Sequence, residues 1–290
     1  MATNNLFGTG SKQVPQNVNL GGMAYQNPDY VKIKNLEVDY ISQIESQIPD
    51  TAVDIFVYDT SKDSDGGAWR YRTTHTSWYN ETLNTATRGS RKEFPAVAVI
   101  VCKSDTLTIY DGDDSNLPMW MVFERNGAVG TNGNIIQDQY GEPQMPVVAL
   151  DASIVVGGSF SVKINFASEI SYLWADATGD WVYKAGISKR NNGLGFYTLD
   201  NGNRIINSRV NDVAMTVLPN APIDDATGLP IPTIAVATDG GVSVIKDDGT
   251  VVDITEVNGT TPVTNFITFT EDNRICFFAD DNDALKWVQV

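Results

Sequence analysis

The stretch IAVATDGGVSVIKDDGTVVDIT, residues 234–255, holds three short runs of Val, Ile, Ala and Thr separated by Asp-Gly turns. β-Branched residues favour strands, and Asp-Gly between two such runs favours a tight hairpin turn. The stretch therefore predicts three antiparallel strands joined by two hairpins. The pattern returns near the end of the chain, where residues 266–270, 275–279 and 285–290 are strand-like and are separated by polar turns.

Similar segments, rich in Val, Ile and aromatic residues, occupy the chain from residue 95 onward. The other predicted strands are 53–58, 96–102, 106–110, 119–123, 147–156, 160–166, 181–185, 195–199 and 211–218. Small antiparallel sheets that repeat about every 45 residues are typical of a β-propeller, which predicts about four or five blades in residues 95–290. An irregular β-sandwich is the alternative. The predicted fold class is therefore all-β, with a β-propeller-like or β-sandwich body.

The chain divides into three zones, residues 1–52, 53–94 and 95–290. The first zone is polar, rich in Asn and Gln, and contains the one helical pattern. Apolar residues recur there at spacings of three and four, namely Leu36, Tyr40, Ile41, Ile44 and Ile48. Such spacing predicts a short amphipathic helix, ended by Pro49, whose apolar face needs a partner. We therefore expect an N-terminal arm and a docking helix ahead of a β-rich body.

The composition excludes several classes of function. The 290 residues include 20 basic and 36 acidic side chains, a net charge of −16, with a pI near 4.3. Nucleic-acid binding needs a basic face for phosphate contacts, and docking on anionic lipid needs a basic face as well. The acidic composition therefore argues against both functions. The single His excludes zinc sites built from two or three imidazoles. The acidity is uneven, because residues 1–94 carry nine basic and eleven acidic side chains whereas residues 95–290 carry eleven and 25.

Residues 62–92 form the local exception, with six basic and only three acidic side chains. We call the candidate binding residues of this segment the aromatic–arginine island: Trp69, Arg70, Tyr71, Arg72, Trp78, Tyr79, Arg88 and Arg91. Its aromatic rings could stack on sugar rings, or its Arg and aromatic side chains could anchor a protein interface, where both types are enriched. The third interpretation is structural, with the aromatics in the core and the Arg side chains paired internally.

Metal and catalytic motifs are weak. Asp59, Ser61, Asp63 and Asp65 alternate before Gly66, as in a calcium loop, but Arg72 stands where an EF-hand needs a bidentate Glu. We therefore predict that these acids, like the oxygen-rich tip at residues 111–115, are solvated turn residues and that no metal is bound.

His75 is the one imidazole available as a base, and no Gly-x-Ser-x-Gly or Gly-Lys-Ser/Thr motif is present. We expect His75 to be a packing or hydrogen-bonding residue, and we expect no enzymatic activity and no cofactor. Cys102 and Cys276 lie in strand-like segments and are predicted to be buried free thiols. No signal peptide is visible at the N-terminus, and the longest apolar run, 96–102, is far shorter than the ~20 residues of a membrane span.

Two stretches carry a resemblance to a known group of proteins. YDTSKDSDGGAWR, residues 58–70, and TSWYNETLNTATRGSRKEFPAVAVI, residues 76–100, resemble sequence in large virion structural proteins of marine bacteriophages. The likeness covers roughly residues 50–125. It implies a tail or surface component with β-rich repeats, made in the cytoplasm of an infected bacterium and located in the virion. It implies no catalytic residue.

From these observations we expect a non-enzymatic virion structural protein, associated with the tail. Residues 1–94 would contact other virion proteins, and the protein would form a homo-oligomer without nucleic-acid binding or membrane insertion. One alternative is a receptor- or glycan-binding tail module, in which Trp69, Tyr71, Trp78 and Tyr79 stack on a host surface glycan. A second alternative is a glycan depolymerase, because 36 acidic residues always include pairs that could flank a glycosidic bond.

Overall fold

The computed structural model describes residues 52–127, 133–177, 179–193, 197–199, 202–255, 263–279 and 284–289. Regular structure in these ranges consists of strands and three short 3-10 helices, η2 (Thr60–Lys62), η3 (Ala68–Arg72) and η4 (Ile187–Lys189). No α-helix occurs in the described part of the chain, and no helix there is long and apolar enough to cross a bilayer. The predicted N-terminal arm and docking helix of residues 1–52 lie almost wholly outside the described residues.

The strands form four main antiparallel sheets. The first sheet contains β1 (Ala52–Asp59), β2 (Val97–Lys103), β3 (Thr106–Asp111) and β4 (Met119–Glu124), in that order. The second runs through β5 (Val147–Leu150), β6 (Ser153–Val156), β7 (Ser161–Asn165), β8 (Ser171–Trp174), β9 (Asp180–Tyr183) and β10 (Tyr197–Thr198).

The third sheet has the order β11 (Val210–Thr216), β14 (Thr233–Thr238), β15 (Gly241–Ile245) and β16 (Val251–Ile254). The separate hairpin of β12 (Ile223–Asp224) and β13 (Leu229–Pro230) lies between β11 and β14 in the chain. The fourth sheet consists of β17 (Thr264–Phe269), β18 (Arg274–Ala279) and β19 (Ala284–Gln289).

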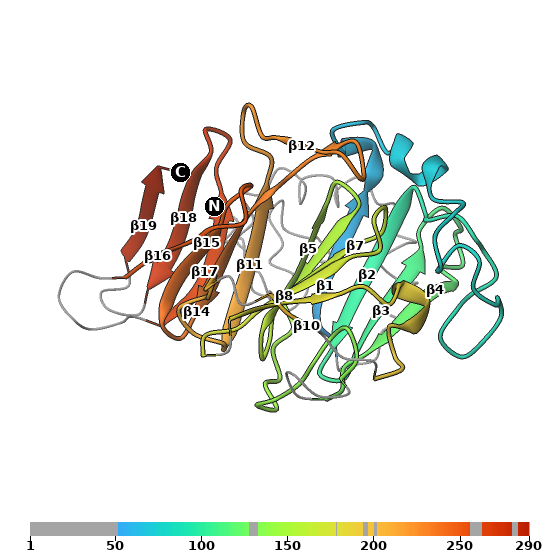
Figure 1. Ribbon diagram of the computed structural model, residues 1–290, viewed down its shortest axis with the longest axis horizontal. Coiled ribbons are helices and arrows are strands. Elements are labelled where there is room, and N and C mark those ends of the chain that lie inside the picture. Colours follow the sequence, from blue (N-terminus) through green and yellow to red (C-terminus); the bar gives the residue numbers. More distant parts are fainter. Residues whose placement is uncertain are drawn as a thin grey trace, which may run out of the picture.

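Each main sheet is a meander, and the sheets adjoin through their first strands. β1 packs beside β5, β5 beside β11, and β11 beside β17. Figure 1 shows the resulting series, with the fourth sheet at one end, the first sheet at the other and the second and third between them. Blade-like meanders joined in this way are the unit of a β-propeller. The predicted all-β class, propeller-like or sandwich, is confirmed.

One hydrophobic core links the first three sheets and crosses the predicted boundary between residues 53–94 and 95–290. β1, from the earlier segment, pairs with β2 along its whole length. Trp78 from the same segment meets Trp120 and Phe166 edge-to-face, with ring centroids 5.4 and 6.0 Å apart. Trp78, Trp120 and Phe166 are all fully buried, so residues 53–94 are built into the body.

Two strand predictions differ from the structure. Residues 147–156 form two strands, because Asp151 and Ala152 adopt left-handed conformations with φ 45° and 58° and reverse the chain. No Asn-Gly or Asp-Gly pair marks this turn. It is held instead by long-range contacts, since the Tyr58 hydroxyl accepts from Ala152 N at 3.0 Å and Asp63 Oδ1 accepts from Asp151 N at 2.9 Å. The second difference is that β8 and the short strands β12 and β13 were not predicted.

A buried aspartate recurs at the joints between sheets. Asp54 lies at a bulge in β1, and its Oδ2 accepts from Val147 N, at the start of β5, at 2.9 Å. Asp212 lies at a bulge in β11, and its Oδ2 accepts from Ile267 N, in β17, at 2.9 Å. Each carboxylate thus supplies an acceptor to the first strand of a following sheet. Burial raises the pKa of Asp54 to about 7 and that of Asp212 well above its usual range.

The raised pKa of Asp54 makes the stability of the protein depend on pH. The folded state keeps a proton that the unfolded state releases near pH 4, so this group's contribution to the free energy of unfolding is complete below about pH 4 and falls until about pH 7. The loss amounts to as much as about 4 kcal/mol. We expect Asp54→Asn to show a smaller decrease in urea-unfolding free energy between pH 4.5 and pH 8 than the wild type. The exposed Asp225→Asn serves as the control, and equal decreases in all three proteins would contradict the prediction.

Candidate functional site

The aromatic–arginine island was the predicted binding region, and the structure places much of it inside the protein. Trp69 and Trp78 are fully buried, and so is Arg88. These three residues cannot contact a glycan or another protein from the surface. The predicted stacking platform of Trp69, Tyr71, Trp78 and Tyr79 is therefore wrong for its two tryptophans.

Trp69 belongs to a buried hydrogen-bond network centred on Asp63. Asp63 Oδ2 accepts from Tyr58 Oη at 2.6 Å and from Trp69 Nε1 at 2.7 Å. The other oxygen, Oδ1, accepts from Asp151 N, and Asp151 in turn accepts from Ser64 N at 2.7 Å. Burial raises the pKa of Asp63 to about 6, against the opposing effect of the bonds from Tyr58 and Trp69. The network joins residues 58–69 to the β5–β6 turn.

Trp78 is also held by a hydrogen bond inside the protein. Its Nε1 donates to Phe166 O at 2.9 Å, and the backbone around it is bound by Glu169. One oxygen of Glu169 accepts from Ser77 N at 2.8 Å, and the other accepts from Ile187 N at 3.2 Å. The hydrogen bonds from Ser77, Trp78 and Ile187 fix the second half of the island against the second sheet.

The arginines of the island are also engaged within the protein. Arg88 donates to Trp120 O at 2.9 Å, and its guanidinium lies 4.5 Å from the Trp120 ring centroid. Burial lowers the pKa of Arg88 to about 10, against the attraction of Glu81. Arg91 binds both Asp111, at 2.8 Å, and Asp113, at 2.7 Å. Arg70, partly buried, donates to a backbone carbonyl of residue 94 at 2.9 Å.

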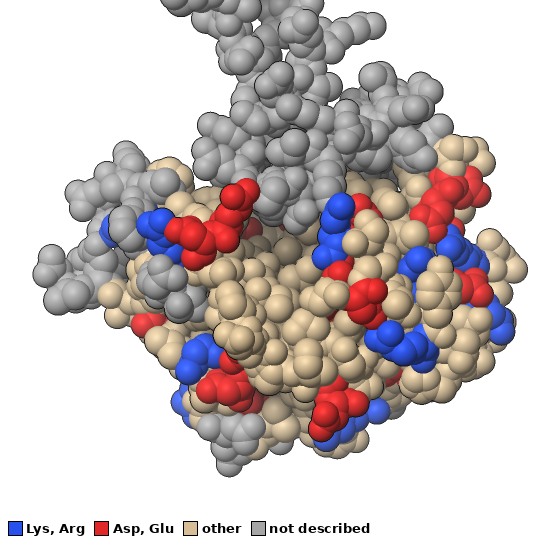
Figure 2. Space-filling view, turned by 90° about the horizontal axis from the view of Figure 1, so that it is seen from above, with Lys and Arg blue, Asp and Glu red and all other residues tan. Residues whose placement is uncertain are grey.

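What remains exposed of the island is small. Tyr71 is 73% exposed and lies beside the Arg70 guanidinium, and Arg72 reaches Asp65 at 2.9 Å. Tyr79 is partly buried and donates to Glu93 at 3.1 Å. On the face shown in Figure 2, basic and acidic side chains lie close together around a broad area without charges.

Three further predictions about single residues need correction. Asp63 and Asp111 were expected to be solvated but are only 5% and 6% exposed. His75 was expected to pack or to hydrogen-bond but is exposed. Cys102 and Cys276 are free, as predicted, but only Cys102 is fully buried. Among the described residues, no group of three or more His, Cys, Asp and Glu side chains is placed to hold a metal ion.

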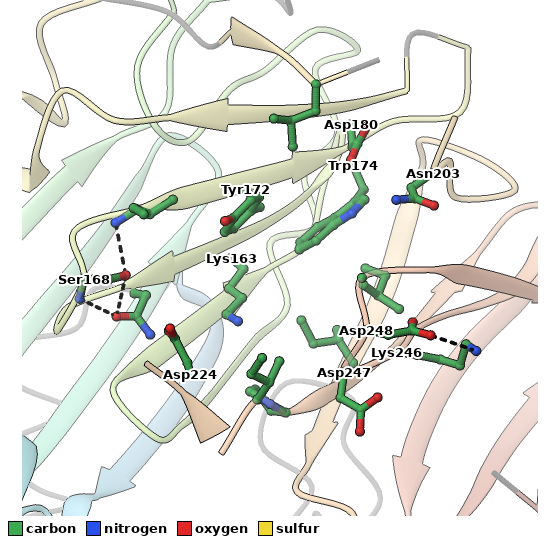
Figure 3. A pocket seen from close by; sticks show the side chains of 18 of the residues that line it. Lys163, Ser168, Tyr172, Trp174, Asp180, Asn203, Asp224, Lys246, Asp247 and Asp248 are labelled. Atoms are coloured by element: carbon green, nitrogen blue, oxygen red, sulfur yellow. Dashed lines mark hydrogen bonds and ion pairs between the residues drawn. The ribbon is translucent and has the colours of Figure 1, made fainter. Parts of the chain in front are cut away.

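A pocket that the sequence patterns do not predict lies between the second and third sheets. Its volume is about 370 Å³. Lys163 and the aromatic pair Tyr172 and Trp174, from β7 and β8, line one side (Figure 3). The β12–β13 hairpin, with Asp224, and the β15–β16 turn at residues 246–249 line the other.

The missed residues had a readable signal. Tyr172 and Trp174 are two positions apart, and alternate residues of a strand share one face. The run Ser171–Trp174 is short, however, and polar residues precede it, so it was not recognised as a strand. Unless β8 is recognised as a strand, nothing in the sequence pattern places Lys163 beside an aromatic pair.

Comparisons with known proteins show little similarity. No family model matches the sequence, and no curated protein is similar to it. One similar solved structure is a selenomethionine-substituted virginiamycin B lyase from Staphylococcus aureus, 10% identical, with a TM-score of 0.25; the match covers 67% of this chain and 66%, just under two thirds, of that one. Another is Hsv2 from Kluyvelomyces marxianus, 10% identical over 66% of this chain and 68% of that one, with a TM-score of 0.24.

The burial of the island leads to a direct test. Trp69→Ala removes a fully buried ring and leaves Asp63 with one donor fewer, so we expect the free energy of unfolding to fall by about 3–5 kcal/mol. Tyr71→Ala, at the exposed end of the same segment, should change it by less than about 0.5 kcal/mol. Urea unfolding followed by circular dichroism measures both. Similar values for the two variants would contradict the structural role of Trp69.

Proposed function

We propose that the protein is a non-enzymatic structural component of a bacteriophage virion, associated with the tail. The observation that carries the proposal is the resemblance of residues 58–70 and 76–100 to virion structural proteins. In the folded chain these stretches contain Trp69, Trp78 and Arg88, which are buried in the body. A resemblance that falls on framework residues supports a shared architecture, and an architectural role follows from it more directly than a shared activity.

The proposed role is to join neighbouring proteins. Residues 1–94 would supply the contacts, to other virion proteins and to further copies of this chain. The described part of this segment still presents Tyr71 and Arg72 on its surface, and Tyr and Arg are frequent anchors of protein interfaces. The acidic residues of the region from 95 onward would keep a many-copy assembly soluble.

The burial of the island affects the two alternative functions differently. The receptor- or glycan-binding alternative loses the site first assigned to it, because Trp69 and Trp78 are buried. No specific observation among the described residues favours the glycan depolymerase.

The proposal predicts that the protein is part of purified particles. Mass spectrometry of gradient-purified particles of the phage that encodes the chain should detect its peptides at a constant ratio to the major capsid protein, and antibodies should label the tail. Host proteins of similar abundance serve as the control for carry-over. A chain that is abundant in the lysate but absent from the particles would overturn the proposal.

The role of the N-terminal segment has a separate test. A chain that lacks residues 1–51 keeps all of β1, so its thermal melting should resemble that of the full chain. Supplied in trans during infection, the full chain should enter particles and the shortened chain should not. Incorporation of both at equal copy number would show that residues 1–51 are not the docking segment, whereas the virion assignment would be unaffected.

A further inference from the structure

The pocket between the second and third sheets contains a ready aromatic surface. Tyr172 and Trp174 are stacked, with ring centroids 5.9 Å apart and an interplanar angle of 23°. Trp174 is 6% exposed and serves mainly as support, whereas Tyr172 is only partly buried. Both rings line the pocket (Figure 3). A flat apolar surface of this kind takes the apolar face of a ring-shaped ligand.

A lysine lies beside this pair, on the same side of the pocket. Lys163 is the cross-strand partner of Tyr172, and Figure 3 shows its ammonium group pointing into the pocket. Among the described residues, no hydrogen-bond or ion-pair partner lies within reach of Lys163 Nζ. Burial lowers its pKa, and the more distant Asp224 carboxylate opposes the change. Three donor positions of an ammonium group are thus available to oxygen atoms of a ligand.

Hydrogen-bond acceptors occupy the opposite wall. Asp224 Oδ1 accepts from Ala226 N at 2.9 Å, and this bond fixes the carboxylate at the start of the β12–β13 turn. Asp247 lies in the β15–β16 turn, and Asn203 adds an amide that can both donate and accept. The Lys163 ammonium group and the aromatic rings on one side of the pocket therefore face acceptors on the other side.

The balance of charges selects the class of ligand. An anion would meet the carboxylates of Asp224, Asp247 and Asp248, and a cation would meet Lys163. An uncharged molecule with several hydroxyl groups avoids both repulsions, because each hydroxyl donates to a carboxylate and accepts from the ammonium group. We propose that this pocket binds a neutral mono- or disaccharide, with the sugar ring on Tyr172 and its hydroxyls between Lys163 and Asp224 or Asp247.

This inference does not depend on the virion assignment, since it concerns the isolated protein in solution. It gives the glycan-binding alternative a site on β7 and β8, away from the aromatic–arginine island. Failure of either proposal leaves the other standing.

The test is titration calorimetry of the full chain, supported by saturation-transfer NMR. The probes are glucose, galactose, N-acetylglucosamine, lactose and cellobiose, with glucuronate and glucosamine as charged counterparts. We expect at least one neutral sugar to bind more tightly than either charged sugar. Tyr172→Ala and Lys163→Met should each weaken binding at least tenfold, which corresponds to about 1.4 kcal/mol. Tyr71→Ala, which removes an exposed tyrosine outside the pocket, should change the affinity less than twofold.

Asp247→Ala keeps the test decisive if a strand variant does not fold, because Asp247 lies in a turn and its loss should also weaken binding severalfold. Circular dichroism establishes which variants are folded. The proposal is overturned if no neutral sugar binds at about 20 mM, if a charged sugar binds more tightly, or if the folded pocket variants bind as well as the wild type.

Discussion

The joints between sheets depend on buried carboxylates that accept backbone N–H groups. The first strand of each main sheet is an edge strand, and a buried N–H group left unpaired on its free edge would cost about 1–3 kcal/mol. Asp54 accepts a hydrogen bond from Val147 N between the first and second sheets, and Asp212 accepts one from Ile267 N between the third and fourth. Asp63 and Glu169 do the same for the segment that carries the aromatic–arginine island. The desolvation of these acids is thus offset in part by the hydrogen bonds that they accept from buried or partly buried backbone N–H groups.

This arrangement changes the meaning of the net charge of −16. Part of the acidity belongs to the interior, where Asp54, Asp63 and Asp212 have raised pKa values. The formal charge therefore overstates the negative charge of the folded protein near pH 6. Within the described residues, Arg88 and Arg190 are buried too, each beside Glu81. The net charge of a sequence segment therefore does not equal the charge on its surface.

Local sequence patterns predicted the strands well and the side-chain environment poorly. Runs such as residues 234–255 form β14, β15 and β16 because β-branched periodicity and Asp-Gly turns act within a few residues. The Asp151–Ala152 turn was missed because Tyr58 and Asp63 hold it from about ninety positions away in the chain. The same limit applies to the candidate sites. Trp69 and Trp78 were candidate surface anchors because their segment is polar and basic. Contacts with residues distant in the chain bury them, namely Phe94, Trp120 and Phe166.

The aromatic–arginine island and the Tyr172–Trp174 pair differ in whether a ligand can reach unpaired polar groups beside them. This difference favours ligand binding at the second cluster. In the aromatic–arginine island, polar atoms such as Trp69 Nε1 and Trp78 Nε1 already have partners inside the chain, so a ligand would gain little there. In the pocket beside β8, Lys163 faces two aromatic rings without a partner of its own among the described residues. A partly buried ammonium group loses part of its hydration when the chain folds, and a ligand oxygen that enters the pocket can supply a hydrogen bond in its place. The Lys163 ammonium group therefore offers a ligand hydrogen-bond donors, which the indole N–H groups of Trp69 and Trp78 do not.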